Sequence, residues 1–206
     1  EQTALYSLAY QVSLLANLLW TSMNQAWSPW LFDNLHANNK SSIRKNSKLY
    51  LGMFAILIVG VLLITPELML ILGGRQYYQA RYVMPPVVLA CSFQFIYGMY
   101  VNVEIYNKKT ATISIGTVCA ALLNIVLNWI FIPIWGYIAA AYATLVGYVA
   151  LFIFHYYIVK VTSPDLSDIY SKRFIFGILF GLTTVSGIAL LLYSNNILRY
   201  VITIAY

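Results

Sequence analysis

The sequence predicts an all-α bundle of membrane-spanning helices. Three observations predict it: continuous apolar runs of about twenty residues, a scarcity of charge, and basic residues that gather in every second link between the runs. Of the 206 residues, 61% are hydrophobic and only 9% are charged, whereas a soluble domain carries about 25% charged residues. So few charges cannot cover a surface in water, but the core of a bilayer tolerates such a surface.

The length of the apolar runs favours helices over a barrel. Inside hydrocarbon, every backbone N–H and C=O must be paired within the protein, which only helices and closed barrels achieve. Barrel strands alternate in polarity over about ten residues, and the runs here do not alternate. We therefore expect six complete spans and the start of a seventh. The expected spans are 4–32, 49–65, 83–105, 111–132, 137–159, 174–193 and the truncated 199–206.

Prolines, glycines and charges mark the expected ends of the spans. A cationic linker is expected over 33–48, after the long and unusually polar first span. Pro66 is expected to end the second span, because proline cannot supply the helical N–H bond. An external segment should then follow over 66–82. Pro133 and Gly136 predict a tight turn between the fourth and fifth spans.

The basic residues predict the orientation of the chain. Alternate links must face the same side of the membrane, and the links after the first, third and fifth spans hold nine of the 12 Lys and Arg residues. These are Lys40, Arg44, Lys45, Lys48, Lys108, Lys109, Lys160, Lys172 and Arg173. The positive-inside rule places them in the cytoplasm. Because the basic residues lie between apolar runs, we expect no nucleic-acid partner.

The sequence carries no catalytic or metal-binding pattern. Cys91 and Cys119 lie inside apolar runs without metal-ligand spacing, so we interpret them as structural. His36 and His155 each stand alone, and we expect them to be solvated or interfacial. The Gly73–Arg75 stretch lacks the spacing of a nucleotide-binding loop. We therefore expect no enzyme activity, no metal and no cofactor.

Polar side chains recur at membrane depth on the first, third and fourth predicted spans. Their three- and four-residue spacing places each set on one helical face. One interpretation is hydrogen bonding between helices, worth about 0.6–2 kcal/mol per bond. The other is a hydrated cavity that meets the hydroxyl groups of a sugar. The candidates for such a cavity are Asn17, Asn24, Gln25, Gln94, Asn102, Asn124 and Asn128.

Three charged residues are further candidates. Glu104 is the one acid inside a predicted span, and a carboxylate there is a candidate proton or ion site. Its spacing also predicts an ordinary i,i+4 ion pair with Lys108 near the cytoplasmic end. Arg75 and Arg81, on the external side, are candidates for contacts with lipid headgroups or phosphate.

Three stretches together carry a resemblance to a known family. Residues 6–32 end in a polar-aromatic Pro motif, and residues 65–80 read Pro-Glu-Leu…Gly…Tyr…Ala. Residues 107–148 combine a Lys-Lys-Thr start, an Asn-x-x-x-Asn helix and a Pro-x-x-Gly-x-x-Ala-Ala-Ala turn. They resemble the polysaccharide-transporter branch of the multidrug/oligosaccharidyl-lipid/polysaccharide exporter superfamily.

The resemblance implies a two-lobe helix bundle with alternating access, in which residues 1–206 form most of the C-terminal lobe. It implies flipping of an undecaprenyl-pyrophosphate-linked oligosaccharide across the bacterial cytoplasmic membrane, for surface polysaccharide biosynthesis. The expected partners are the lipid bilayer, this substrate, and the polysaccharide polymerase and chain-length machinery. Two alternatives stay open. One is a cation-coupled multidrug antiporter of the same superfamily, and the other is a membrane scaffold for polysaccharide assembly.

Overall fold

The structure, a computed structural model, describes residues 2–194 and 200–203. Over these residues all regular structure is helical and no strand occurs, which confirms the predicted fold class. The long helices are α1 (Gln2–His36), α2 (Lys40–Gly73), α3 (Met84–Tyr106), α4 (Thr110–Trp135), α5 (Tyr137–Thr162) and α6 (Lys172–Leu192). Two 3-10 segments join them, η1 (Arg75–Val83) and η2 (Pro164–Leu166).

Five helical segments are long and apolar enough to cross a membrane. They comprise α2, α4, α5, α6, and α3 with the end of η1. The first helix has 35 residues but is not among them, because its polar side chains lower its hydropathy. The predicted first span over 4–32 therefore stays a prediction. Residues 200–203 are helical, and the rest of the predicted span 199–206 lies outside the described residues.

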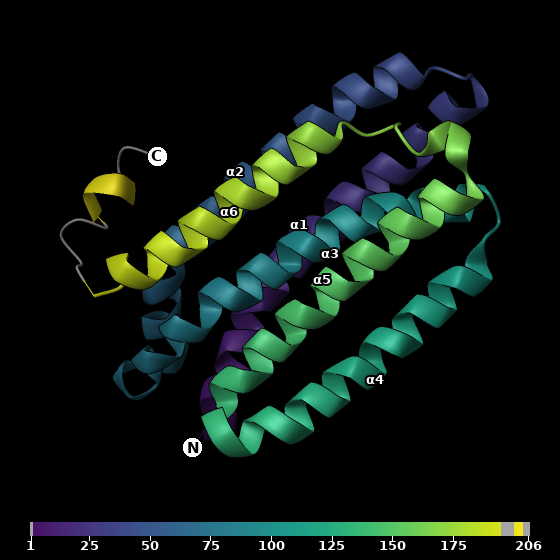
Figure 1. Cartoon of the computed structure of the whole chain (residues 1–206). Helices are drawn as coiled ribbons and strands as arrows, with labels where there is room; N and C mark the ends of the chain where they lie inside the picture. Colours follow the sequence, from purple (N-terminus) through teal and green to yellow (C-terminus); the bar gives the residue numbers. More distant parts are fainter. Residues whose placement is uncertain (1, 195–199, 204–206) are drawn as a thin grey trace.

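The helices pack side by side around α3. Figure 1 shows α4 at one edge of the bundle and the α2–α6 pair at the other. The central α3 packs against α1, α2, α5 and α6. By contrast, α4 packs mainly against α5, and Gly116 is its one buried residue. The core of the bundle therefore lies around α3, while α4 presents an apolar surface to its surroundings.

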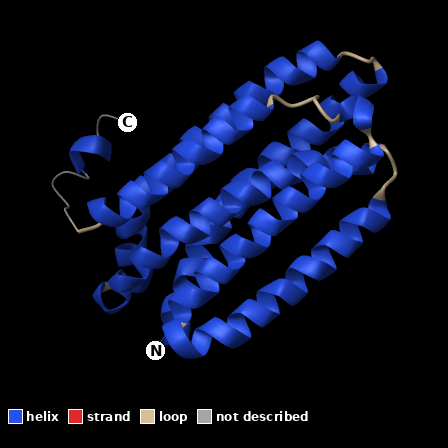
Figure 2. Ribbon diagram, viewed as in Figure 1, coloured by secondary structure: helices blue, strands red, loops and turns tan. Residues whose placement is uncertain are grey.

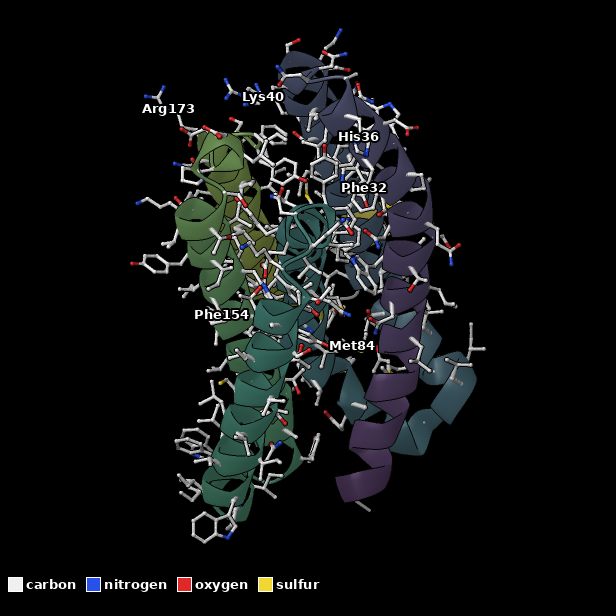
Figure 3. The ribbon with its side chains drawn as sticks, turned by 90° about the vertical axis from the view of Figure 1, so that its right-hand side faces the viewer. Phe32, His36, Lys40, Met84, Phe154 and Arg173 are labelled. Carbon is white, nitrogen blue, oxygen red and sulfur yellow. The ribbon has the colours of Figure 1, made fainter. Side chains whose placement is uncertain are left out.

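The links predicted to share one side of the membrane do meet at one end of the bundle. Lys40, which begins α2, donates from Nζ to the carbonyl oxygen of Asp165 at 2.9 Å, and this bond joins the α1–α2 and α5–α6 links. Asn107 Nδ2 donates to Ser163 Oγ at 2.8 Å, which ties in the α3–α4 turn. Figure 2 shows the three loops in tan at this end, and Figure 3 shows Lys40 and Arg173 there. The alternation of links is confirmed; its cytoplasmic orientation stays a prediction.

The predicted cationic linker over 33–48 is wrong, because most of this stretch is helical. Helix α1 continues to His36, and α2 begins at Lys40. Asn39 allows so short a break by capping α2: its side-chain oxygen accepts a bond from the Ser42 N–H at 3.3 Å. The basic residues therefore lie on the first turns of a helix rather than on a loose loop.

The prediction that Pro66 ends the second span is also wrong, since α2 continues to Gly73. Proline removes the N–H that would bond to the carbonyl four residues earlier, which here belongs to Leu62. The hydroxyl of the buried Tyr193, after α6, donates to that carbonyl at 2.6 Å. The orphaned acceptor is thus paired from another helix. The predicted external segment 66–82 is correspondingly the end of α2 followed by η1.

This bond predicts a measurable coupling between two distant residues. Tyr193→Phe should lower the free energy of unfolding by about 1–3 kcal/mol, because the Leu62 carbonyl stays buried and unpaired. In a Pro66→Ala background the new N–H can bond that carbonyl, so Tyr193→Phe should cost about 1 kcal/mol less. Reversible unfolding of the four variants in mixed micelles measures the difference. An equal cost in both backgrounds would contradict this role of Tyr193.

Candidate functional site

The predicted polar residues of the first and third spans do not form one cluster. Asn102 on α3 donates from Nδ2 to Asn24 Oδ1 on α1 at 2.8 Å, so these two amides join helices. Asn17 is half-buried on α1, and Gln25 is exposed. Gln94 is buried on α3, and its Oε1 has no hydrogen-bond partner among the described residues. The packing interpretation therefore holds for the Asn24–Asn102 pair.

Asn124 of the fourth span lines a pocket between α4 and α5, whereas Asn128 lies outside the lining. Asn128 Nδ2 donates to Asn124 Oδ1 at 2.8 Å along the same helical face. Asn124 forms one wall of an open cavity of about 360 Å³, here called the α4–α5 pocket. The other polar groups of its lining are Thr117, Thr144 and Tyr148. The pocket thus offers amide and hydroxyl groups inside two apolar helices.

A buried acid and base face each other across α3 and α5. Glu104 is 1% exposed and His155 is 0% exposed. His155 Nδ1 lies 2.6 Å from Glu104 Oε1. The predictions of a Glu104–Lys108 ion pair and of a solvated His155 are therefore wrong. Since α3 ends at Tyr106 and Lys108 takes a left-handed backbone with φ of 57°, Lys108 is not one helical turn beyond Glu104.

The hydroxyl of Thr112 brings a third helix to this carboxyl group. Thr112 lies in the first turn of α4, and its Oγ1 contacts Glu104 Oε2 at 2.5 Å. The same oxygen lies 2.6 Å from the carbonyl oxygen of Lys109. One carboxyl group thereby joins α3, α4 and α5, and an acid–base pair of this kind can exchange a proton.

The far side of the His155 ring is buried without a partner. Its Nε2 has no hydrogen bond among the described residues. A Cβ added to Gly116 on α4 would lie 3.2 Å from this nitrogen and 2.7 Å from Cε1 of Phe154, which lies where α4 meets α5 (Figure 3). The missing side chain of Gly116 therefore lets α4 approach the histidine closely.

The two predicted headgroup arginines differ in their surroundings. Arg81 is 9% exposed, and its guanidinium lies 3.7 Å from the ring centre of Tyr78 and 4.6 Å from that of Tyr82. Its Nη2 also donates to the Tyr82 hydroxyl at 3.0 Å. The protein itself therefore holds Arg81, by cation–π contacts. Arg75 is exposed and stays a candidate for a headgroup contact.

The outer face of α4 decides the environment of the chain. Large apolar side chains cover it, among them Trp129 at 80% exposure and Leu122 at 57%. A continuous exposed surface of this kind, repeated on α2 and α6, suits lipid rather than water. The chain is a polytopic membrane protein.

No protein-family model, no curated protein and no solved structure matches it. Among the described residues, no group of three or more His, Cys, Asp and Glu side chains could hold a metal ion.

Sequence reasoning missed Thr112, Thr144, Tyr148 and the role of His155. A usable signal was present on the fifth span. Thr144, Tyr148 and His155 are separated by four and seven residues, which places them on one helical face. A polar stripe on this span would have predicted that α5 shares a polar interface with the Asn124 face of α4.

Two glycine substitutions test the close approach of α4 and α5. Gly52→Ala on α2 should be neutral or raise the free energy of unfolding by up to about 1 kcal/mol, because nothing lies within 4 Å of the new methyl group. Gly116→Ala should instead lower it by about 1–3 kcal/mol, because the methyl group collides with Phe154 and His155. Unfolding of both variants in mixed micelles gives the comparison. Equal gains in stability would rule out the tight contact.

Proposed function

We propose that the chain forms one lobe of a bacterial transporter that flips an undecaprenyl-pyrophosphate-linked oligosaccharide across the cytoplasmic membrane. The observation that carries the proposal is the α4–α5 pocket. It places the amide of Asn124 and the hydroxyls of Thr117, Thr144 and Tyr148 inside membrane-spanning helices. Polar groups are costly at that depth and usually serve a function there.

The hydrogen-bonding capacity of the pocket suits a sugar. Asn124 Nδ2 makes no hydrogen bond within the described chain, so its donors are available. A sugar hydroxyl both donates and accepts, so it can accept a bond from this amide. The resemblance of residues 107–148 to the exporter family points to the same class of substrate.

The cationic end of the bundle fits the anionic part of such a substrate. A second cavity, of about 430 Å³, is lined there by Lys40, Lys109, Asn38 and Asn107, with one acidic residue, Asp165, on the same lining. Lysine and amide donors of this kind suit the oxygens of a pyrophosphate. In the proposal, the lipid-linked sugar enters from this side, which the positive-inside rule assigns to the cytoplasm.

The buried Glu104–His155 pair favours a second candidate, a cation-coupled multidrug antiporter of the same superfamily. An embedded acid is what such a transporter needs in order to bind H⁺ or Na⁺. The two functions differ in their cargo rather than in their helices. Resistance to cationic drugs on expression, with unchanged surface polysaccharide on deletion, would favour the antiporter.

Deletion of the gene tests the first candidate. Lipid-linked repeat units should accumulate on the inner leaflet and surface polysaccharide should be lost, because their export stops. Complementation with Asn124→Leu should restore about tenfold less surface polysaccharide than the wild type, which corresponds to one lost hydrogen bond of about 1.4 kcal/mol.

The matched control is Thr184→Val on α6, whose hydroxyl bonds only to its own helix at the Phe180 carbonyl. It should complement fully, with both variants present in the membrane at equal amounts by immunoblot. Unchanged surface polysaccharide after deletion would refute the flippase function. Full activity of Asn124→Leu would remove the pocket from the transport path.

A further inference from the structure

We infer that Glu104 and His155 form a proton-binding site that controls the α4–α5 pocket. The identity of what the pocket holds rests on the proposed function, whereas proton binding does not. The pair lies inside the bundle rather than at its surface. It joins α3 to α5, one wall of the pocket, and Thr112 connects it to α4, the other wall. Three observations support the inference. They are the number of hydrogen bonds that the Thr112 hydroxyl can donate, the path for a proton from Glu104 to water, and the ring contacts between His155 and the pocket.

The contacts of Thr112 fit a protonated Glu104. Its hydroxyl oxygen lies within hydrogen-bond distance of both Glu104 Oε2 and the Lys109 carbonyl oxygen. A hydroxyl has one proton and can give a full, near-linear hydrogen bond to only one of two acceptors. If Oε2 is ionised, one of these contacts holds no hydrogen. If Oε2 carries a proton, Glu104 donates to Thr112 and Thr112 donates to Lys109, so both contacts are hydrogen bonds.

The other carboxyl oxygen fits a neutral imidazole. His155 Nδ1–H donates to Glu104 Oε1 in both protonation states of the acid, so the pair can lose one proton without losing that bond. Loss breaks the O–H bond of Oε2, leaves a carboxylate, and passes the proton to water. The unpaired Nε2 of His155 can bind a second proton, so the pair has more than one protonated form.

Thr112 supplies the route between the buried acid and water. Glu104 is almost fully buried, while Thr112 is half-exposed and the turn over 107–109 is more open still. That turn belongs to the cationic end of the bundle, where Lys108 and Lys109 lie. A proton can therefore move between Oε2 and water through one hydroxyl group.

The proton site is in contact with the pocket through an aromatic chain. The Tyr97 ring stacks on His155 with centroids 5.5 Å apart, and on Tyr148 with centroids 6.0 Å apart. Tyr148 lines the pocket, as does Thr117, the residue after Gly116. A carboxylate left in this buried site is poorly solvated. Separation of α4 from α5 would hydrate it, and that same movement changes the pocket.

Few other ionisable groups face the pair. Tyr97 on α3 is a titratable neighbour of His155 by ring contact, and Tyr148 on α5 contacts Tyr97 in turn. From α4, the hydroxyl of Thr112 reaches the pair. Neither Lys108 nor Lys109 forms an ion pair with Glu104. The charged residues of the described parts of α1 and α6 lie at the cationic end of the bundle. They are Asp33, Lys172 and Arg173, with His36 beside Tyr106.

Infrared difference spectroscopy of the full protein in lipid nanodiscs tests proton binding. Between about pH 4 and pH 10, the wild type should lose a C=O stretch of a protonated carboxyl group. Glu104→Gln should lack this band at every pH. His155→Asn should keep the band and change its frequency, because the hydrogen-bond partner of the carboxyl has changed. A band that never changes with pH, or one that survives in Glu104→Gln, would overturn the inference.

Asp168→Asn is the matched control, because this carboxyl group is exposed on the α5–α6 link. The hydrogen bond from Lys172 lowers the pKa of Asp168, so this carboxyl group stays ionised over most of the pH range and its loss should not affect the band.

If Glu104→Gln fails to insert in the membrane, Thr112→Val replaces it as the test variant. Loss of the hydroxyl should slow the pH-jump response of the band, and an unchanged rate would refute the proton route.

Control of the pocket is tested by the distance between spin labels at Val118 on α4 and Ile153 on α5, both of which are exposed. The distance should increase with pH in the wild type and stay at its low-pH value in Glu104→Gln. A distance that does not change with pH would overturn the inference that the Glu104–His155 pair controls the pocket. If the band titrates and the distance responds, but deletion leaves surface polysaccharide unchanged, the flippase function fails while the proton site stands.

Discussion

Each polar group within hydrocarbon needs a partner inside the protein, because the bilayer core offers none. This requirement explains the helices themselves, which pair their own backbones. It also explains the bond from Tyr193 to the Leu62 carbonyl, which Pro66 would otherwise leave unpaired, and the amide bond between Asn24 and Asn102. The bundle is therefore held by a few directional bonds at fixed depths, while its apolar contacts with neighbours and lipid fill the remaining surface.

The same requirement makes the unpaired groups informative. His155 Nε2 and Asn128 Oδ1 are both buried without partners, and both lie on the two helices that form the α4–α5 pocket. Groups left unpaired at this depth cost stability, so an unpaired ring nitrogen beside a buried carboxyl group favours a functional role for the histidine. A proton can bind that nitrogen. Gly116 contributes by letting α4 approach the histidine closely.

The sequence predicts the helices and the grouping of the links, because these depend on local hydropathy and on the distribution of Lys and Arg. It fails where a partner is distant along the chain. Glu104 has Lys108 four residues away, but its partner His155 is 51 residues away. Pro66 is compensated by a tyrosine 131 residues beyond the carbonyl that it frees. Arg81 is a different case, because its partners are close along the chain: neighbouring tyrosines hold it, and their ring positions depend on the 3-10 backbone of η1 rather than on spacing.

Both proposed transport functions require helices that cross the bilayer with their links on alternate sides. Single cysteines at Lys45, Arg173 and Trp135, in a background without reactive cysteines, test this directly with a membrane-impermeant maleimide. The structure places Lys45 and Arg173 at one end of the bundle and Trp135 at the other. We expect Trp135→Cys to react in intact cells, and Lys45→Cys and Arg173→Cys to react only after permeabilisation. Labelling of Lys45→Cys and Arg173→Cys from opposite sides would contradict the arrangement.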